Sequence, residues 1–485
     1  MNDRHRNDRN RNDRNRNQPG RSAAERTRVQ PSRTVALDVI SAVRESDAYA
    51  NLLLPGRIAR AGLSPADAAL ATELTYGTLR MQGYYDRVIA RAAGRTVDKI
   101  DPPLLDVLRL GAHQLLSTRV ASHAAVNESV ALARQVGSRS GTGFVNGVLR
   151  EIGRSTPEEW RARVLADAKN EDERYAALSS HPAWIVRAFH RALESEGRGD
   201  ELEALLEADN TAPRVNLVAL PGLADPPEGA RPDRFSPVGF TAGGGDPQGL
   251  VTEAEGRLRV QDEGSQLAAL ALTRARPVEP GERWLDLCAG PGGKAALLAA
   301  EALAGGATLV ANEVVPARAE LVRRALAAVP LDVPVWERDG VGIGAEEPES
   351  FDRILLDAPC TGLGALRRRP EARWRKTPRD VAELTALQTR LLDSAVAALK
   401  PGGLLAYITC SPHVAETRAI VADALDRHRG ALRPVGTADI VQSVAEERLD
   451  LAGDPDLVQL WPHRHLTDAM FIAVLEKAGG DASAP

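Results

Sequence analysis

Two cysteines of the chain, Cys360 and Cys410, stand where a nucleophile could act. Cys360 directly follows the apolar run FDRILLDAP (351–359), and Cys410 lies within LLAYITCS (404–411). Runs of this kind are typical of buried parallel strands, whose carboxyl ends meet at one edge of a sheet. A free cysteine is most often a small buried hydrophobe, but two thiols at the ends of adjacent strands favour chemistry.

Methylation of carbon 5 of a pyrimidine would explain why thiols are needed there. A thiolate that adds to carbon 6 breaks the aromaticity of the ring and makes carbon 5 able to attack a sulfonium methyl group. The thiolate leaves when a base removes the proton from carbon 5. Asp357, close before Cys360, could stabilise the adduct by proton donation or hydrogen bonding at the pyrimidine edge. The base must be single-stranded or flipped out of its stack.

A glycine-rich turn, DLCAGPGGK (286–294), connects a predicted strand to an Ala/Leu-rich helix. Glycines let such a turn bend sharply and let a ligand approach its amides. Alone, the turn could be structural or could bind NAD, FAD or S-adenosylmethionine, and the P-loop pattern is absent. Acidic residues end the following strands, at Glu313, Asp339 and Asp357. They favour S-adenosylmethionine, because a carboxylate can accept ribose hydroxyls and a cationic sulfonium suits an acidic pocket. Cys288, inside the turn, is better explained by packing.

Short apolar runs alternate with helix-length segments after residue 257, which predicts an α/β doubly wound, Rossmann-like domain with its ligands at the carboxyl ends of the strands. Residues 33–154 have apolar residues at helical spacing and predict an all-helical bundle. The segment 221–256 is rich in Gly, Pro and Asp, which favours irregular, exposed connections over a core element. The chain is therefore expected to be multidomain.

The composition describes a globular chain, with 43% hydrophobic and 26% charged residues among 485. The amino terminus has no apolar core for a signal peptide, and no apolar run is long enough for a membrane helix, so we expect a cytoplasmic protein without a membrane partner. The three cysteines are widely spaced and unpaired in sequence, which predicts neither a disulfide framework nor a metal site. Residues 1–34 hold ten arginines and four acidic residues and predict a disordered tail.

A basic segment follows Cys360: residues 367–379 hold seven basic residues and one acid, with Trp374 among them. A solvated charged loop is the simplest interpretation. Next to a flipped base, however, guanidinium groups can hold phosphates and an indole can stack on a base. The predicted RNA-binding residues are Arg367, Arg368, Arg369, Arg373, Trp374, Arg375 and Lys376.

Five stretches in order resemble the bacterial 16S ribosomal RNA cytosine-5 methyltransferases of the RsmB/Sun (Fmu) branch of the NOL1/NOP2/Sun family. They are QDEGSQL (261–267), DLCAGPGGK (286–294), FDRILLDAPCTGLGALRRRPEARWR (351–375), LKPGGLLAYITCS (399–411) and TDAMFIAVL (467–475). The amino-terminal stretches ALATELTYGTLR (69–80), HAAVNESVALAR (123–134) and GFVNGVLR (143–150) are similar to the NusB-like domain that this branch carries.

The resemblance implies a role for each candidate residue. Cys410 would be the nucleophile, Cys360 would assist release of the methylated product, and Lys294 would lie with Asp357 at the junction of cofactor and substrate. The S-adenosylmethionine site would comprise Cys288, Ala289, Gly290, Pro291, Gly292, Gly293, Lys294, Glu313, Asp339 and Asp357. Three departures stand out: Gly290 where Ala is usual, Glu313 where Asp is commoner, and TDAMF (467–471) in place of TDGFF.

The resulting expectation is an S-adenosylmethionine-dependent RNA cytosine-5 methyltransferase of 16S ribosomal RNA that acts in rRNA processing as a monomer. We expect a tail at 1–32, a NusB-like helical RNA-binding domain at 33–155, a connecting helical and small α+β subdomain at 156–257, a methyltransferase domain at 258–478 and a tail at 479–485. One alternative is a NusB-like RNA-binding or antitermination factor with an inactive enzyme domain. Another is methylation of a different RNA, such as transfer RNA.

Overall fold

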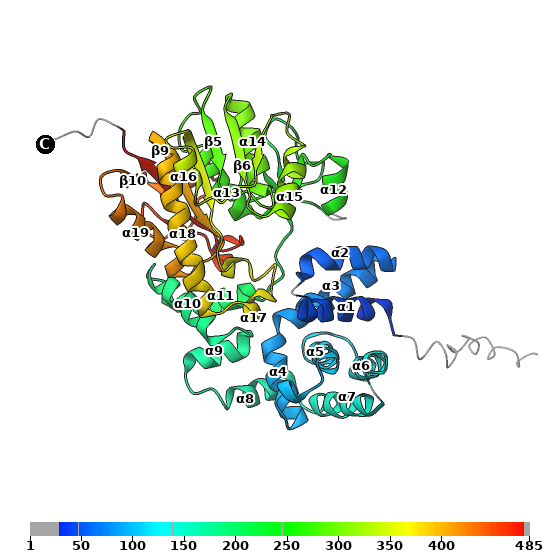
Figure 1. Ribbon diagram of the computed structural model, residues 1–485. Helices are drawn as coiled ribbons and strands as arrows, with labels where there is room; N and C mark the ends of the chain where they lie inside the picture. Colours follow the sequence, from blue (N-terminus) through cyan, green and yellow to red (C-terminus); the bar gives the residue numbers. More distant parts are fainter. Residues whose placement is uncertain (1–28, 47, 138, 244–246, 480–485) are drawn as a thin grey trace, which may run out of the picture.

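The structure is a computed structural model that describes residues 29–46, 48–137, 139–243 and 247–479. Most of the predicted amino-terminal tail, residues 1–28, and the carboxyl-terminal residues 480–485 lie outside the described residues. The described chain forms an all-helical amino-terminal domain, a connecting region and an α/β domain (Figure 1).

The amino-terminal domain is helical, as the spacing of its apolar residues predicts. Nearly every residue from Leu104 to Gln114 is buried, so the helix that carries them forms the centre of the bundle. Pro31, Pro65 and Pro102 each occupy the first turn of a helix, where a missing amide hydrogen costs nothing. The helices are α1 (Pro31–Glu45), α2 (Ala50–Ala61), α3 (Pro65–Arg80), α4 (Gln82–Ala93), α5 (Pro102–Ser117), α6 (Ser122–Val136) and α7 (Arg139–Ile152), with a 3-10 turn η2 (Val97–Lys99).

The connecting region contains more regular structure than its composition indicates. Residues 221–256 were expected to be irregular and exposed, and this is wrong in part: residues 221–230 are irregular and none of them is buried, but buried Phe235 and Phe240 draw the following residues into a small antiparallel sheet. The sheet has the order β2-β3-β1-β4. Its elements are β1 (Asn216–Ala219), β2 (Arg231–Pro232), β3 (Gly239–Thr241) and β4 (Leu258–Val260), with α12 (Pro247–Glu253); before them come α8 (Pro157–Leu165), α9 (Glu171–Ser179), α10 (Ala183–Glu194), η3 (Gly199–Glu201) and α11 (Leu202–Asp209).

The α/β domain is built on a mixed sheet with the order β10-β12-β9-β8-β5-β6-β7, and β11 pairs with β12. Strands β5 to β9 are parallel, and β12 runs antiparallel to β9. Each apolar run predicted as a strand contains one, which confirms the doubly wound fold. The strands are β5 (Arg283–Asp286), β6 (Thr308–Asn312), β7 (Val335–Trp336), β8 (Phe351–Asp357), β9 (Leu399–Thr409), β10 (Leu432–Pro434), β11 (Val458–Gln459) and β12 (Phe471–Lys477).

Helices cover both faces of this sheet, which explains why its strands are apolar throughout. In β9, Leu404, Ala406 and Ile408 join one core, while Leu405 and Tyr407 join the other. The first core lies beneath α13 (Glu263–Thr273), α14 (Gly293–Gly305), α15 (Pro316–Leu326) and α20 (Thr437–Val444), and the second beneath α16 (Ile343–Glu346), α18 (Pro378–Ala398) and α19 (Arg418–Arg427). Short turns complete the domain: η4 (Leu363–Ala365), α17 (Ala372–Arg375), η5 (Val414–Glu416) and α21 (Pro462–His465).

The loop after β8 joins the α/β domain to the helical domain. It passes through η4 and α17, and α17 lies between the two domains in Figure 1. Buried Arg373 donates hydrogen bonds to the carbonyl oxygens of Arg80 in α3 and Asp209 in α11, at 3.0 and 2.8 Å. The carboxyl-terminal edge of the sheet is therefore tied to the helical domain.

No helix among the described residues is long and apolar enough to cross a membrane. The described part of the chain also contains no cluster of three or more His, Cys, Asp or Glu side chains arranged to hold a metal ion.

Candidate active site at the carboxyl edge of the sheet

The structure brings Cys360 and Cys410 together, as their positions after neighbouring strands predict. β8 and β9 are adjacent and parallel, and Asp357 is paired in register with Ile408. The two Sγ atoms lie 3.5 Å apart, within hydrogen-bond distance, and both residues are partly exposed. The two thiols therefore lie together at the carboxyl edge of the sheet, close enough for one substrate to meet both.

The contact between the sulfur atoms moves the two thiol pKa values in opposite directions. A hydrogen bond from Cys360 lowers the pKa of Cys410 and outweighs its desolvation, and the cations Lys294 and Arg369 act in the same direction. The same hydrogen bond, together with burial, raises the pKa of Cys360 well above its ordinary value. Cys410 is thus the group that ionises first, and Cys360 is its hydrogen-bond donor.

A buried carboxylate, Glu416, joins the two loops that carry the thiols. Its oxygens accept hydrogen bonds from the amide and hydroxyl of Thr361, at 2.7 and 2.5 Å, and from the hydroxyl of Ser411 at 2.6 Å. Gln388 from α18 donates to the carbonyl of Pro359 at 2.8 Å and reaches Glu416 at 3.4 Å. Because Thr361 and Ser411 directly follow the two cysteines, one side chain fixes both loops.

Lys294 and Asp357 form an ion pair beside the thiols. Lys294 Nζ lies 2.8 Å from Asp357 Oδ2, and its side chain is largely buried. Desolvation alone would lower the pKa of Lys294, but the carboxylate of Asp357 outweighs it and raises the pKa. Lys294 is in the first turn of α14 and Asp357 ends β8, so the pair connects the glycine-rich turn with the thiol loops.

The glycine-rich turn is closed by Glu313 at the end of β6. Glu313 Oε2 accepts the amide of Gly290 at 3.1 Å, and Oε1 accepts the amide of Val315 at 3.0 Å. A Cβ atom at position 290 would lie 2.1 Å from Oε2, so this contact requires glycine there. Arg318 lies across the turn, 3.4 Å from Glu313 Oε2 and 2.5 Å from the carbonyl of Gly290.

The other predicted cofactor residues surround this turn at different depths. Gly292 has φ +102°, a conformation that glycine alone adopts easily, and a Cβ there would collide with Ala325. Asp339 is exposed and accepts the amide of Val341, whereas Ala289 is buried and its amide donates to the carbonyl of Asn312. The remaining turn residues are the exposed Pro291 and the half-buried Gly293 and Cys288.

Burial raises the pKa values of two acids in the turn. The pKa of Asp286 rises to about 8, first through desolvation and then through the charge of Asp357. The pKa of Cys288 is raised for the same reasons, so its thiol stays protonated. This agrees with packing as the role expected for Cys288.

Two residues of the basic segment are internal, and for these two the sequence-based expectation needs correction. Arg367 and Arg373 are buried and cannot contact RNA in this structure. Arg367 donates to the carbonyl of Leu466 at 2.9 Å, and Arg368 pairs with Asp262 at 2.6 Å and with Asp468 at 3.1 Å. Arg375 donates to two carbonyls of the helical domain. Arg369 and Trp374 are exposed, and Arg368, Arg375 and Lys376 are partly exposed.

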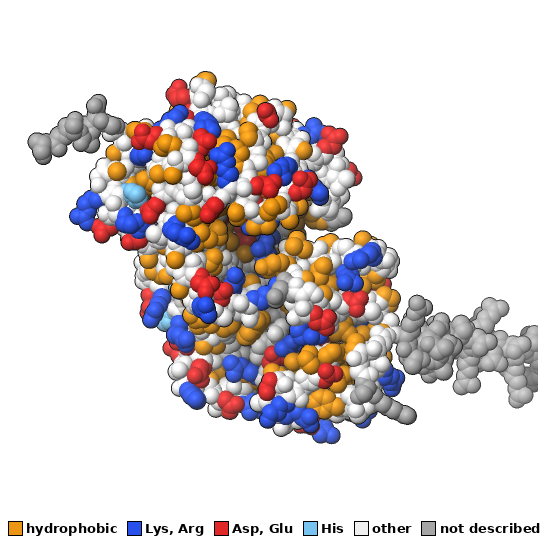
Figure 2. Space-filling view, viewed as in Figure 1, with side chains coloured by type: hydrophobic (Ala, Val, Ile, Leu, Met, Phe, Trp, Pro, Cys, Tyr) orange, Lys and Arg blue, Asp and Glu red, His pale blue; other side chains and the backbone are white. Residues whose placement is uncertain are grey.

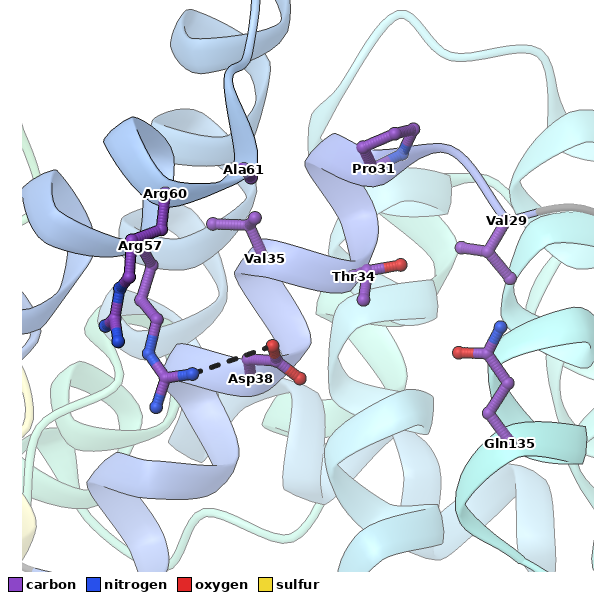
Figure 3. Close-up of a pocket in the computed structure, with 9 residues that line it drawn as sticks. All are labelled: Val29, Pro31, Thr34, Val35, Asp38, Arg57, Arg60, Ala61 and Gln135. Carbon is purple, nitrogen blue, oxygen red and sulfur yellow. Dashed lines mark ion pairs between the residues drawn. The ribbon is translucent and has the colours of Figure 1, made fainter.

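A separate cavity of about 440 Å³ lies in the helical domain, away from the thiols. It opens between α1, α2 and α6, with Asp38 and Arg57 forming an ion pair 4.0 Å long on its wall (Figure 3). Its lining residues are Val29, Pro31, Thr34, Val35, Asp38, Arg57, Arg60, Ala61 and Gln135. None of them is a predicted site residue.

Sequence reasoning missed Glu416, Arg318 and the role of Gly290. No local signal marks Glu416, because its partners Thr361 and Gln388 are remote in sequence and the nearby Ser411 does not by itself indicate a role. A signal did exist for Gly290: both it and Glu313 depart from the family pattern, and the structure shows that the two residues are in contact.

Comparison with known proteins agrees with this architecture. The family of 16S rRNA methyltransferases RsmB/F matches residues 274–476, and the NusB family matches residues 30–154. The crystal structure of PH0851 covers 93% of this chain and 99% of its own with a TM-score of 0.74 at 24% identity, which shows the same fold.

Curated relatives extend over nearly the whole chain. A putative methyltransferase of Mycobacterium tuberculosis is 47% identical over 93% of this chain and 98% of its own length. A probable ribosomal RNA small subunit methyltransferase B of Synechocystis is 31% identical over 92% of this chain and 99% of its own, and the ribosomal RNA small subunit methyltransferase B of Pseudomonas putida is 33% identical over 82% and 90%. With these relatives and an α/β domain that carries its candidate residues at the expected strand ends, the chain belongs to the RsmB/F family of 16S rRNA methyltransferases.

Proposed function

We propose that this protein transfers a methyl group from S-adenosylmethionine to carbon 5 of a cytosine in 16S ribosomal RNA, with Cys410 as nucleophile and Cys360 as the group that assists release. The observation that carries the proposal is the polarised pair of thiols. One thiol with a lowered pKa lies 3.5 Å from a second with a raised pKa, beside the Lys294–Asp357 ion pair. Transfer to carbon 5 of a pyrimidine needs such a thiolate.

The residues around the glycine-rich turn fit S-adenosylmethionine. The Glu313 carboxylate stands at the end of β6, where it can accept ribose hydroxyls. Val314 follows it with 57% of its surface exposed and offers an apolar surface to an adenine. When bound, the cofactor supplies an electrophilic methyl group on a cationic sulfonium, which the carboxylates of Glu313 and Asp357 favour.

The chain's own residues would act in two stages. In the first, the Cys410 thiolate bonds to carbon 6 of the base, and the electron pair displaced in the ring is stabilised by a proton or hydrogen bond from the Lys294–Asp357 pair. Carbon 5 then bonds to the methyl group, whose bond to the sulfonium sulfur breaks and leaves its electron pair on that sulfur. In the second, the proton on carbon 5 is removed and the electron pair of that carbon–hydrogen bond restores the ring while the Cys410 sulfur leaves as thiolate.

Cys360 is suited to the second stage because its pKa depends on the state of Cys410. The largest cause of its raised pKa is the hydrogen bond with Cys410. When the sulfur of Cys410 is bonded to the base it carries no charge, so this cause is removed and Cys360 can ionise more readily. It can then accept the proton from carbon 5. Formation of the adduct therefore prepares the group that ends it.

The substrate is proposed to be 16S ribosomal RNA in the cytoplasm, with the protein acting as a monomer. Relatives at 31% and 33% identity are named ribosomal RNA small subunit methyltransferase B. The exposed side chains of Arg369 and Trp374 follow the Cys360 loop and suit an unpaired strand.

Ribosomal RNA that contains 5-fluorocytosine tests the chemistry, because fluorine cannot be removed as a proton and the adduct persists. With S-adenosylmethionine present, the unmodified protein should form an adduct that survives denaturation, and Cys410→Ala should form none. Cys360→Ala should form an adduct on ordinary RNA as well, since release is slowed. Absence of an adduct with the unmodified protein would favour an RNA-binding factor with an inactive enzyme domain. An adduct in Cys410→Ala would overturn the assignment of the nucleophile.

A further inference from the structure

The junction between the two domains carries a group of aromatic and basic side chains that faces solvent. Trp374 in α17 and Tyr49, immediately before α2, are 39% and 36% exposed. The guanidinium carbons of Arg369 and Arg375 lie 5.1 and 5.2 Å from the centre of the Tyr49 ring. We call Tyr49, Arg369, Trp374 and Lys376 the junction patch; it combines residues of both domains, and the helical domain contributes Tyr49.

The junction patch rests on a fixed framework. Glu371 Oε1 accepts the amide of Ala50 at 3.1 Å, and Arg375 Nη2 donates to the carbonyls of Val43 and Ala48 at 2.8 and 2.7 Å. Trp374 lies against Gly83 of α4, where a Cβ atom would be 2.3 Å from the indole ring. The aromatic rings are therefore held in place while part of each stays exposed, an arrangement that lowers the entropic cost of binding.

The charge that the junction patch presents is positive. Glu371, the one acid of residues 367–376, is buried, and desolvation raises its pKa. Arg369 is exposed, and Lys376 is partly exposed. The space-filling view shows a recess between the α/β domain and the helical domain (Figure 2). A negatively charged chain would be attracted to this part of the surface.

The segment that carries three members of the junction patch starts at the thiols. It begins at Cys360, and the amide of Gly364 donates to the carbonyl of Cys410 at 2.9 Å. Arg369 is close enough for its charge to act on Cys410. A strand that presents one base to Cys410 has neighbouring nucleotides that must lie somewhere along this surface.

We propose that the junction patch binds the unpaired nucleotides that flank the target base. Tyr49 and Trp374 provide the rings on which bases and guanidinium groups stack, and Arg369 and Lys376 hold phosphates. This rests on the proposed function, since it names the part of the RNA that the site holds. Single-stranded RNA is favoured over an acidic protein because exposed rings with interleaved cations recognise both the bases and the phosphates of such a strand. The helical domain thereby completes the substrate site.

Binding of a fluorescein-labelled 12-nucleotide single-stranded RNA with a central cytosine, measured by anisotropy without cofactor, tests this. Tyr49→Ala and Trp374→Ala should each weaken binding about tenfold, the effect of losing one stacked base. Tyr49→Phe should bind like the unmodified protein. Leu52→Ala is the matched control, because Leu52 is 71% exposed in α2 and lies outside the junction patch.

The salt dependence separates stacking from charge. Arg369→Ala should reduce the slope of log affinity against log salt by about 0.7, the value for one phosphate contact with a single strand. Tyr49→Ala should leave that slope unchanged. Thermal unfolding of each variant and its affinity for S-adenosylmethionine should match those of the unmodified protein, which excludes a folding defect in any variant that passes.

Three outcomes would overturn the proposal. The first is equal RNA affinity of Tyr49→Ala, Trp374→Ala and the unmodified protein, and the second is an equal loss of RNA affinity in Leu52→Ala. The third is that a poly-glutamate peptide competes equally for Tyr49→Ala and for the unmodified protein while RNA binding is unaltered. Failure of the proposed function is distinguishable. It would appear as no adduct with 5-fluorocytosine RNA, while the binding differences among these variants would persist.

Discussion

The Sγ atoms of Cys360 and Cys410 lie 3.5 Å apart, and the hydrogen bond between them lowers the pKa of one thiol and raises that of the other. The two groups are therefore chemically distinct before any substrate is bound. The hydrogen bond sets their order. Among the surrounding charges, Asp357 raises both pKa values, Glu416 raises that of Cys360, and the cations Lys294 and Arg369 lower that of Cys410.

The first prediction concerns the pH dependence of adduct formation with 5-fluorocytosine RNA. The thiolate of Cys410 is the reactive form, so the rate should rise with pH and level off above a midpoint that lies below the ordinary thiol pKa of 9.0. Cys360→Ala removes the hydrogen-bond donor and should move the midpoint to higher pH. Below the midpoint, each unit of upward shift in the pKa lowers the thiolate fraction about tenfold.

Cys360→Ser is the matched variant for this measurement, since its hydroxyl can still donate a hydrogen bond. Its midpoint should lie between those of the unmodified protein and Cys360→Ala. The same midpoint in all three proteins would show that Cys360 does not tune Cys410.

The second prediction concerns Glu416 as a positioning residue. Glu416→Gln replaces one of the two acceptor oxygens with an NH2 group that donates, so either the oxygen shared by the hydroxyls of Thr361 and Ser411 or the oxygen that accepts from the Thr361 amide is lost. The rate of adduct formation should fall about ten- to a hundredfold while the affinity for S-adenosylmethionine stays unchanged. A buried donor left without a partner costs about 1–3 kcal/mol, so the unfolding temperature should fall as well.

Glu383→Gln is the control, because Glu383 lies exposed on α18 and pairs only with exposed Arg379 on the same helix. The adduct rate should also be measured over a pH series, because lost stability alone would not change how this rate depends on pH. If Glu416→Gln forms adduct at the unmodified rate, the loops that hold the thiols are fixed by other contacts.

The third prediction concerns pH-dependent stability and rests on Asp233 in the small sheet. Desolvation raises its pKa from 3.8 to about 7, although a hydrogen bond from Asn216 opposes this. In the unfolded chain the carboxyl ionises near its ordinary pKa, so the folded state is favoured below that value. The benefit is lost as pH rises through about 7.

Thermal unfolding at pH 5 and pH 8 should therefore show a lower midpoint at pH 8, because between pH 5 and a folded pKa of about 7 this group loses roughly 3 kcal/mol of unfolding free energy at most. Asp233→Asn stays neutral and should reduce the difference between the two pH values. Asp225→Asn, an exposed substitution in the same region, should leave the difference unchanged. An undiminished difference in Asp233→Asn would assign the pH dependence to other groups.

The fold and the positions of the two thiols could be predicted because their signals are local. Apolar runs that are buried on both faces identify the parallel strands, and a residue directly after such a run must lie at the edge of the sheet. Cys360 and Cys410 were placed in this way, and Lys294 by the family resemblance; the structure brings all three to the same edge.

The basic segment shows why the rest could not be predicted. A run of arginines is usually solvated, and nothing nearby in sequence indicates that Arg373 is buried. Its acceptors are the carbonyls of Arg80 and Asp209 and the side chain of Asn210, more than a hundred residues away. Burial of such a group is decided by how the domains pack, which the local sequence does not encode.

The fourth prediction concerns the coupling of Gly290 with Glu313. Because a Cβ at position 290 would lie 2.1 Å from Glu313 Oε2, Gly290→Ala must displace the carboxylate from its contact with the turn. Affinity for S-adenosylmethionine, measured by titration calorimetry, should fall about tenfold. Glu313→Asp shortens the side chain but lets the turn keep its shape. It should therefore weaken S-adenosylmethionine binding less than Gly290→Ala does.

The double variant Gly290→Ala with Glu313→Asp should bind S-adenosylmethionine more tightly than Gly290→Ala alone, since the shorter acid leaves room for the new methyl group. Residues in direct contact typically show coupling energies of about 0.5–3 kcal/mol in such a cycle. Gly147→Ala in α7, where a Cβ atom meets nothing within 4 Å, controls for a general effect of replacing a glycine. Strictly additive losses would show that the two departures from the family pattern are independent. A recovery in the double variant would show that glycine at 290 is what allows the longer acid at 313.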